Sequence, residues 1–308
     1  YPVTEIAASA FARCDKIGKV ELPDTVKRLG QSAFAWSGVT EINLPEGVTE
    51  IPKRAFADSK LTKIEIPETV MWIWDEAFAG CGNLQEVTLP DSLEFIGMIA
   101  FANTGVEQIE LKGNPGFASY IFSSCSRLEK VVMADTITEL GSNMFAYCEN
   151  LKTIDWSENM ERINGEAFVG CSGLTEVRLP SKVKYIDGGV FRQCTNLEQI
   201  MIPPSVEEIG EAFDASIIIL CFEGSYAQQY AEEQGLRYIL IEDENEEVEI
   251  SQYGQLEYIV RNDEVVIFSC LPEAEGDIVI PAEIEHEGVK YPVTEIAASA
   301  FARCDKIG

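Results

Sequence analysis

Histidine is the side chain most often used as a general base near neutral pH, and this sequence contains one, His286. A Ser-His-Asp or Cys-His centre would have to use it, and a metal site with several histidines is ruled out. The surrounding residues, Glu285-His286-Glu287-Gly288, are typical of a solvated turn. No G-x-S-x-G, G-x-G-x-x-G or P-loop motif occurs. We therefore expect no catalytic residue, no cofactor and no enzyme activity.

Carboxylates are abundant, with 52 Asp and Glu against 23 Lys and Arg. Paired carboxylates catalyse glycoside hydrolysis. With so many acidic residues, however, such pairs occur throughout the chain, and stacked repeats would place them on an open surface and not in a closed cleft. Six acids crowd into residues 242–249, which favours a solvated linker. A calcium site there is the alternative, although the EF-hand spacing is absent. We expect no bound metal.

The nine cysteines follow a pattern, because seven of them lie three residues after a recurring phenylalanine. Ser37, Ser59, Thr104 and Ser216 occupy the same place elsewhere. A position that accepts Cys, Ser or Thr requires a small buried group, so we expect free thiols throughout and no disulfide framework. Zinc is the alternative, but no C-x-x-C pair exists. The expected structural ladder comprises Cys14, Cys81, Cys125, Cys148, Cys171 and Cys194.

An internal repeat positions these cysteines. Ten phenylalanines recur at steps of 21 to 23 residues, and six of them are followed 11 or 12 residues later by proline. The segment L-x-x-I-x-L before the proline alternates as a half-buried strand should, and proline then ends the strand. No repeat buries its apolar face alone, so stacking must stabilise the chain. We expect one continuous parallel sheet. The phenylalanines are Phe11, Phe34, Phe56, Phe78, Phe101, Phe122, Phe145, Phe168, Phe191 and Phe213.

This period, and the order L-P…V-x-x-I…A-F…C…L…I, resemble the BspA-like leucine-rich repeat family of bacterial surface proteins. The resemblance covers about 1–222 and implies an α/β leucine-rich-repeat solenoid of about ten coils, strand-rich with short helical turns and curved as a right-handed horseshoe. One repeat departs from the pattern, because Lys112 to Phe117 replaces the V-x-x-I segment. We expect a bulge or kink there.

The predicted organisation has four parts. An array over 1–222 is followed by a helix-strand cap over 223–241, with Ser225 before the helix and Gly235 after it. The acidic linker then covers 242–255. Residues 256–308 are expected to form an N-terminal cap hairpin, with its turn at Asn262-Asp263, a strand over 277–280, and the first coil of a second array.

Residues 291–308 read YPVTEIAASAFARCDKIG, which is identical to residues 1–18. Either a natural tandem duplication or a cut through a periodic molecule gives this identity. The sequence thus predicts that the cap hairpin folds against 291–308 or docks on the first coil of a neighbouring molecule, which would give head-to-tail self-association.

Two surface regions are candidates for ligand binding. Trp72, Trp74 and Phe95 form an aromatic group at return-segment positions that are charged in most other coils; they either bind a sugar or peptide or fill a groove beside the irregular coil. The second region is the less acidic end of the outward strand column. Its candidates are Val132, Arg178 and Met201.

Composition limits the partners. The net charge of −29 argues against nucleic acid and anionic membranes, and no apolar run reaches 18 residues, so no membrane insertion is expected. The family resemblance implies a secreted or cell-surface binding scaffold, non-catalytic, that adheres to host, matrix or bacterial surface proteins. A glycan ligand and a passive structural spacer are the alternatives.

Overall fold

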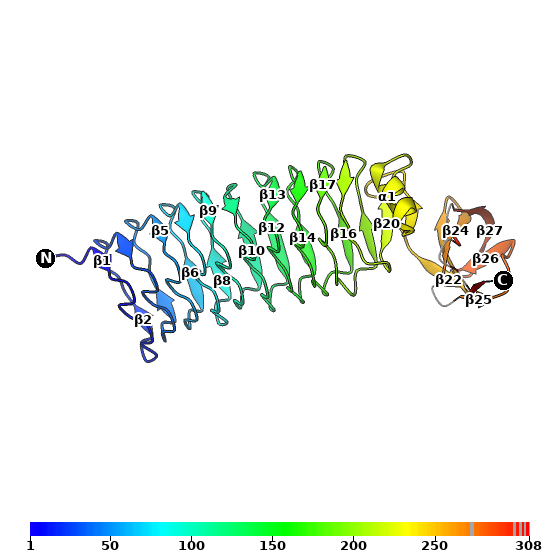
Figure 1. The fold of residues 1–308 in the computed structure, drawn as a ribbon. Coiled ribbons are helices and arrows are strands. Elements are labelled where there is room, and N and C mark those ends of the chain that lie inside the picture. Colours follow the sequence, from blue (N-terminus) through cyan, green and yellow to red (C-terminus); the bar gives the residue numbers. More distant parts are fainter. Residues whose placement is uncertain (272–273, 298–299, 302–303, 305, 308) are drawn as a thin grey trace. The chain divides into compact units, whose positions relative to one another are not determined.

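The computed structural model describes residues 1–271, 274–297, 300–301, 304 and 306–307. The chain divides into two compact units, one formed by Tyr1–Leu197 with Ser205–Asp214 and the other by Glu198–Pro204 with Ala215–Gly308. Unit 1 is a stack of coils that follow one another in sequence order, coloured blue to green in Figure 1. The chain is a strand-rich, leucine-rich-repeat-like solenoid of about ten turns, and the predicted domain boundaries stay a prediction.

Each coil of unit 1 contains two short strands joined by turns. The outward strand ends at the proline, whose carbonyl accepts the amide of the valine three residues on, as in Val26 to Pro23 (3.0 Å) and Val70 to Pro67 (3.0 Å). The first strand row comprises β2 (Lys19–Val20), β4 (Glu41–Ile42), β6 (Lys63–Glu65), β8 (Glu86–Thr88), β10 (Gln108–Leu111), β12 (Lys130–Met133), β14 (Thr153–Asp155) and β16 (Glu176–Arg178).

The V-x-x-I segments form a second strand row. The prediction of one continuous parallel sheet is wrong, because the strands of each row are divided among several separate sheets. Parallel pairing is broken into short sheets on both sides, because most strands hold only two or three residues between turns. This row comprises β1 (Glu5–Ile6), β3 (Arg28–Leu29), β5 (Glu50–Ile51), β7 (Trp72–Ile73), β9 (Phe95–Ile96), β11 (Gly116–Phe117), β13 (Glu139–Leu140), β15 (Arg162–Ile163), β17 (Tyr185–Ile186) and β19 (Glu208–Ile209).

The segments around the repeated phenylalanines are consecutive turns and not the short helical turns that the family resemblance implies. In nine coils the residues two before and two after the phenylalanine have positive φ, for example Glu76 at 57° and Gly80 at 74° around Phe78. This geometry turns alternate amides toward the next coil, where Glu76 donates to Met98 (2.9 Å) and Phe78 to Ala100 (2.8 Å). These bonds tie neighbouring coils together on a third side.

The ten phenylalanines stack into one column, the Phe ladder. Successive rings lie 4.9 to 6.1 Å apart between centroids, and their planes differ by 12° or less. Eight of the ten rings, Phe34 to Phe191, have no solvent exposure. The ladder is therefore the continuous apolar core of unit 1.

The cysteine positions form a second column beside the Phe ladder. The thiol of Cys148 donates to the carbonyl of Phe122, one coil back, at 3.2 Å. The thiol of Cys171 does the same with Phe145 at 3.2 Å. The hydroxyl of Thr104 donates to Phe101 at 2.9 Å. The position thus suits a small side chain with one weak donor, in keeping with its use of Cys, Ser and Thr.

The irregular repeat keeps one pairing and loses the next. Gly113 has a φ of 63°, and β11 still pairs with β9 in parallel, with Gly116 opposite Phe95. The sheet then stops, since the order β11-β9-β7-β5 ends here and β13 begins the order β13-β15-β17-β19. The expected irregularity is present as this break in the second strand row.

Unit 2 begins with three parallel strands, β18 (Gln199–Met201), β20 (Ile218–Cys221) and β21 (Arg237–Leu240). Helix α1 (Tyr226–Gln234) is the predicted capped helix: the Ser225 hydroxyl accepts the amide of Gln228, and Gly235 closes it with a φ of 61°. These caps satisfy amides and carbonyls that a nine-residue helix otherwise leaves unpaired.

The predicted hairpin is present in unit 2 as β23 (Leu256–Arg261) and β24 (Glu264–Cys270), with positive φ at Asn262 and Asp263. Around it lie β22 (Ser251–Tyr253), β26 (Glu283–His286) and β27 (Val289–Ile296), and β25 (Glu275–Gly276) pairs with β28 (Lys306–Ile307). The predicted strand over 277–280 is wrong. Val279 is 78% exposed there, and β26 is an edge strand of the sheet instead.

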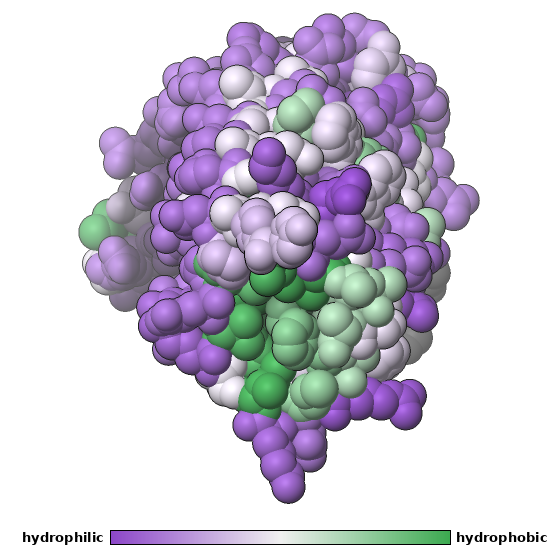
Figure 2. Space-filling view, turned by 90° about the vertical axis from the view of Figure 1, so that its left-hand side faces the viewer, coloured by the Kyte–Doolittle hydropathy of each residue, from purple (hydrophilic) through white to green (hydrophobic). Residues whose placement is uncertain are grey.

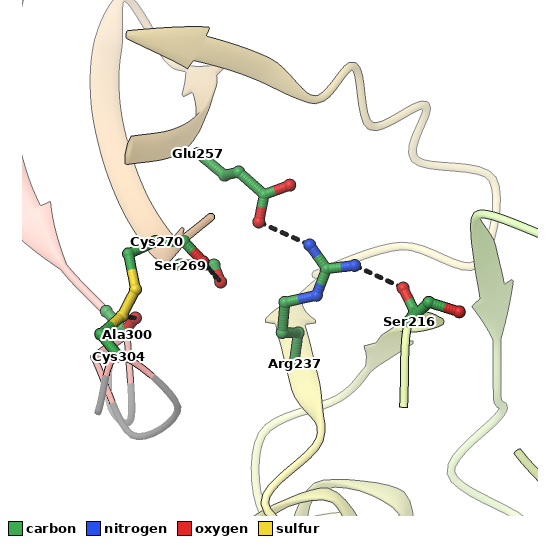
Figure 3. A network of polar contacts seen from close by, with 7 residues as sticks. All are labelled: Ser216, Arg237, Glu257, Ser269, Cys270, Ala300 and Cys304. Atoms are coloured by element: carbon green, nitrogen blue, oxygen red, sulfur yellow. Dashed lines mark hydrogen bonds and ion pairs between the residues drawn. A yellow bond between two sulfur atoms is a disulfide. The ribbon is translucent and has the colours of Figure 1, made fainter. Parts of the chain in front are cut away.

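The expectation of nine free thiols is also wrong. Cys270 and Cys304 form a disulfide, with Cα atoms 6.4 Å apart, and the other seven cysteines are free (Figure 3). Cys304 lies three residues after Phe301, the same position that the array cysteines occupy after their phenylalanines. Its coil packs on the cap hairpin, where Cys270 at the end of β24 is the disulfide partner. The coils of the array have no cysteine that corresponds to Cys270.

Candidate binding surfaces

The positive-φ residues that flank the Phe ladder form an exposed surface, which we call the turn ridge. It comprises the residues two before and two after each ladder phenylalanine from Phe11 to Phe191. Three of its side chains are large, aromatic and exposed: Trp36 (44%), Tyr120 (39%) and Tyr147 (48%). The guanidinium of Arg13, also on the ridge, lies 5.6 Å from the centre of the Trp36 ring.

A hollow of about 350 Å³ opens on the turn ridge beside Trp36. Its walls include the carboxylate of Asp58 and the amide of Asn103, and an Arg54–Glu76 ion pair at 2.6 Å forms one side. Gly80 lines the hollow as well, and a Cβ at this residue would lie 2.3 Å from Asp58 Oδ1. A small residue between larger neighbours thus keeps the hollow open.

The aromatic group predicted from sequence does come together on the second strand row. Trp72 and Phe95 are register partners on β7 and β9, and the rings of Trp74 and Phe95 lie 5.9 Å apart at 54°. Trp74 is 40% exposed and donates from Nε1 to Glu50 Oε2 at 2.7 Å, whereas Trp72 and Phe95 are half-buried. The Phe95 ring lies beside Gly116 of the irregular repeat. Ligand binding by the group of Trp72, Trp74 and Phe95 stays a prediction.

The three candidates from the outward strand column do not form one site. Val132 is half-buried between its register partners Glu110 and Asp155. Arg178 lines a shallow hollow of about 220 Å³ that also contains Trp156. Met201 was expected on an outward face, but it is 4% exposed.

Met201 is buried because it packs with Ile218, Leu220 and the hairpin residues Ile259 and Phe268 within unit 2. An ion pair between Arg237 and Glu257 at 2.5 Å joins β21 to the same hairpin (Figure 3). The hairpin therefore covers the outer side of these strands.

His286 is not the solvated loop residue that was expected. It ends β26, where its half-buried ring has Nδ1 at 3.2 Å from the Tyr258 hydroxyl and 3.5 Å from the Ser251 hydroxyl. The turn that was predicted here follows it, with positive φ at Glu287 and Gly288. The contacts with Tyr258 fix the ring inside the cap.

Cys81 and Cys194 have the properties of structural and not reactive thiols. Burial raises the pKa of the Cys81 thiol to about 11 and that of Cys194 to about 12. Reactive cysteines have lowered pKa values and solvent access. Within the described residues, no group of three or more His, Cys, Asp or Glu side chains is arranged to hold a metal ion.

The sequence reasoning missed the hollow on the turn ridge. Reading every residue two after the ladder phenylalanine would have placed Trp36, Asp58 and Asn103 in one column. The positive φ that turns them outward is unusual for residues other than glycine, so it could not be predicted.

In the part of the chain that is described, no helix has both the length and the apolar character needed to cross a membrane.

The parallel coils, the Phe ladder and the period of 21 to 23 residues define a leucine-rich-repeat solenoid. The family model described as the BspA type leucine-rich repeat region, which spans six copies, matches residues 4–115 and 115–220. The chain therefore belongs to the BspA-type leucine-rich repeat family, as the sequence indicated.

Several solved structures are similar to this chain. A leucine-rich repeat protein from Bacteroides ovatus is 23% identical, with 79% of this chain and 88% of that chain covered and a TM-score of 0.43. A leucine-rich cell surface protein from Faecalibacterium prausnitzii is 24% identical, covering 75% and 86%, with a TM-score of 0.35. The pneumococcal vaccine antigen PcpA is 20% identical, covering 78% and 85%, with a TM-score of 0.40. A search of the curated proteins found no match.

Proposed function

We propose that this chain is a non-catalytic binding scaffold of the bacterial surface or surroundings, which adheres to protein ligands through the turn ridge. Membership of the BspA-type family supports a scaffold role. The proposal includes the right-handed, horseshoe-like curvature that the family resemblance implies. An extended stack offers many weak contacts, and their sum gives avidity when several engage together.

The observation that carries this proposal is the presence of three exposed aromatic side chains on the turn ridge. Trp36, Tyr120 and Tyr147 are 44%, 39% and 48% exposed, and each is anchored through its own amide to the next coil, at 2.7 Å, 3.1 Å and 2.7 Å. Trp, Tyr and Arg are enriched among the residues that dominate protein interfaces. Because the backbone is already ordered, binding sacrifices little conformational entropy.

The charge of the chain favours a basic partner surface. With a net charge of −29, the chain attracts cationic surfaces at long range, and the effect falls with ionic strength. We therefore expect association rates that decrease as salt is raised.

A glycan ligand is the second candidate, favoured by the hollow beside Trp36. An aromatic face together with a carboxylate, a guanidinium and an amide is the mixture that binding pockets use to hold and orient polar ligands. Asp58, Arg54 and Asn103 supply those groups in one hollow of about 350 Å³. The predicted group of Trp72, Trp74 and Phe95 is the alternative place for a sugar to stack.

The test screens the protein against a panel of purified extracellular-matrix proteins and a glycan array. Binding to matrix proteins that Trp36→Ala weakens supports the scaffold proposal. Binding to glycans alone, lost in Trp36→Ala or in Trp72→Ala, replaces it with sugar recognition at the corresponding site. No binding in either screen favours the passive spacer.

A further inference from the structure

The hollow beside Trp36 is built from four successive coils of the array, those of Phe34, Phe56, Phe78 and Phe101. These four rings have no solvent exposure, so the coils that carry the lining residues are packed on both sides. The flanks of the stack, seen from the first coil, are mostly hydrophilic (Figure 2). With about 350 Å³, the hollow falls within the range of ligand sites, about 300–1,000 Å³.

Part of the lining is apolar. The methyl groups of Ala57 and Ala79, the backbone of Gly80 and the indole of Trp36 contribute this surface. The indole is 44% exposed, so much of its surface is open to a ligand. The hydrocarbon stem of a lysine or an arginine packs on surface of this kind while its charged end stays in a polar environment.

The polar part of the lining carries one uncompensated negative charge. The Lys53 ammonium lies 3.7 Å from a carboxylate oxygen of Asp75 and 3.7 Å from one of Glu76. The Arg54 guanidinium lies 2.6 Å from Glu76. These two cations and two acids neutralise one another. The Asp58 carboxylate, by contrast, forms no ion pair or hydrogen bond with any described residue.

The other two acidic residues of the turn ridge are both paired. Glu76 is paired with Arg54, as described above. Glu166 forms an ion pair with Arg192 and accepts a hydrogen bond from Asn143 Nδ2 at 2.8 Å. An unpaired carboxylate beside an exposed indole attracts cations in two ways, through charge-assisted hydrogen bonds and through cation–π attraction.

We propose that this hollow binds a basic side chain of a protein ligand, a lysine ammonium or an arginine guanidinium. The stem of that side chain packs on Trp36, Ala57 and Ala79. Its charged end donates hydrogen bonds to the Asp58 carboxylate and to the side-chain carbonyl of Asn103. The assignment rests on the proposed function, because it specifies the chemistry that the turn ridge recognises in a protein ligand.

Other classes of ligand fit this lining less well. An anion is repelled by Asp58, and the Arg54 guanidinium is already engaged by Glu76, to which Nε donates at 2.7 Å. A divalent metal ion needs several oxygen ligands, and the described residues contain no group of three or more His, Cys, Asp or Glu arranged to hold one. A neutral sugar can bond to Asn103 but leaves the charge of Asp58 uncompensated.

The test uses the full chain labelled with ¹⁵N-tryptophan, in about 0.15 M salt, where charges more than about 8 Å apart are largely screened. The probes are three blocked tripeptides with lysine, arginine or uncharged norleucine between two glycines. The chain has four tryptophans, and Trp36→Phe assigns the indole N–H signal of Trp36. We expect the lysine peptide, the arginine peptide or both to shift this signal and leave those of Trp72, Trp74 and Trp156 unchanged. The norleucine peptide should bind at least fivefold more weakly.

Two variants test the role of the carboxylate. Asp58→Asn removes the charge, keeps the shape and should weaken peptide binding at least fivefold. Gly80→Ala should weaken it as well, because the new Cβ would lie 2.3 Å from Asp58 Oδ1 and displace the carboxylate. Alanine is tolerated here, since Asp58 and Asn103 have positive φ at the same place in neighbouring coils. Asp91→Asn, which changes an exposed acid outside the hollow, is the matched control and should change nothing.

The outcomes separate this proposal from the scaffold proposal. No shift of the Trp36 signal with either basic peptide, equal affinity for the norleucine peptide, or unchanged affinity in Asp58→Asn would overturn the basic side chain as the ligand. A neutral glycan that shifts the signal when neither basic peptide does would assign the hollow to sugars. A matrix protein whose binding is weakened by Trp36→Ala but not by Asp58→Asn would retain the scaffold proposal and overturn this one. If no matrix protein binds, the scaffold proposal fails, and the peptide titration still decides what the hollow binds.

Discussion

Removal of one ring from the middle of the Phe ladder should be far more costly than removal of a ring at its end. Phe101 has no solvent exposure, and its ring lies 4.9 Å from Phe78 and 5.2 Å from Phe122. Core Phe→Ala substitutions cost about 3–5 kcal/mol, more when the surroundings cannot collapse into the cavity. Backbone hydrogen bonds from the Phe101 amide to the Ile121 carbonyl (2.9 Å) and from the Asn103 amide to the Ser123 carbonyl (2.9 Å) fix the spacing between adjacent coils, so the coils cannot collapse into the cavity. We therefore expect Phe101→Ala to lower the free energy of unfolding by about 4 kcal/mol.

Phe11→Ala is the matched control. Phe11 is half-buried and stacks on one neighbour, so about half of the apolar area is at stake and the expected loss is about 2 kcal/mol. Urea unfolding followed by circular dichroism, at a concentration where the protein is monomeric, gives both values. Repeat arrays lose cooperativity when one interface weakens, so the Phe101→Ala transition should also broaden. A loss below about 1 kcal/mol at Phe101, or equal losses at both positions, would refute the account of the ladder as the core.

Three further predictions concern the columns beside the ladder. Cys148→Ser should change stability little, because serine and threonine fill this position in other coils, whereas Cys148→Leu should overpack the column and cost about 1–3 kcal/mol in urea unfolding. Ile99 has a φ of 61°, which is strained for a β-branched residue, so Ile99→Gly should raise the unfolding free energy by about 1 kcal/mol, while Ala100→Gly next to it should not. The buried Cys81 thiol has its pKa raised from 9.0 to about 11; above pH 9 the unfolded chain loses this proton while the folded chain keeps it, so stability should fall by about 1.4 kcal/mol per pH unit up to pH 11, and Cys81→Ser should remove that share of the slope.

Much of the fold could be predicted because the same structural signals recur in every repeat. The recurring phenylalanine, the strand-ending proline and the alternating L-x-x-I-x-L segment each indicate one part of a coil, and stacking follows since no coil is stable alone. The capped helix at Tyr226–Gln234 was equally predictable, because Ser225 and Gly235 are specific signals for its ends.

The remainder depended on features that local sequence does not encode. Glu76 and Trp36 adopt positive φ because backbone hydrogen bonds to the next coil compensate for the strain. The residue types themselves give no indication of this conformation. Met201 has the alternation of an exposed position, but the cap hairpin covers it. The Cys270–Cys304 bond joins a hairpin end to a repeat position, so the repeat pattern alone argued against it.

The central claim is that the turn ridge binds the ligand, and one affinity comparison tests it most directly. The triple variant Trp36→Ala/Tyr120→Ala/Tyr147→Ala is compared with the wild type for binding to whichever immobilised matrix protein the panel identifies. The control replaces Tyr226 and Tyr253, which are 39% and 46% exposed in unit 2, with alanine. We predict that the ridge variant weakens binding at least tenfold, with unchanged circular dichroism, and that the control binds as the wild type does. Unchanged affinity of the ridge variant, or an equal loss in the control, would contradict the claim.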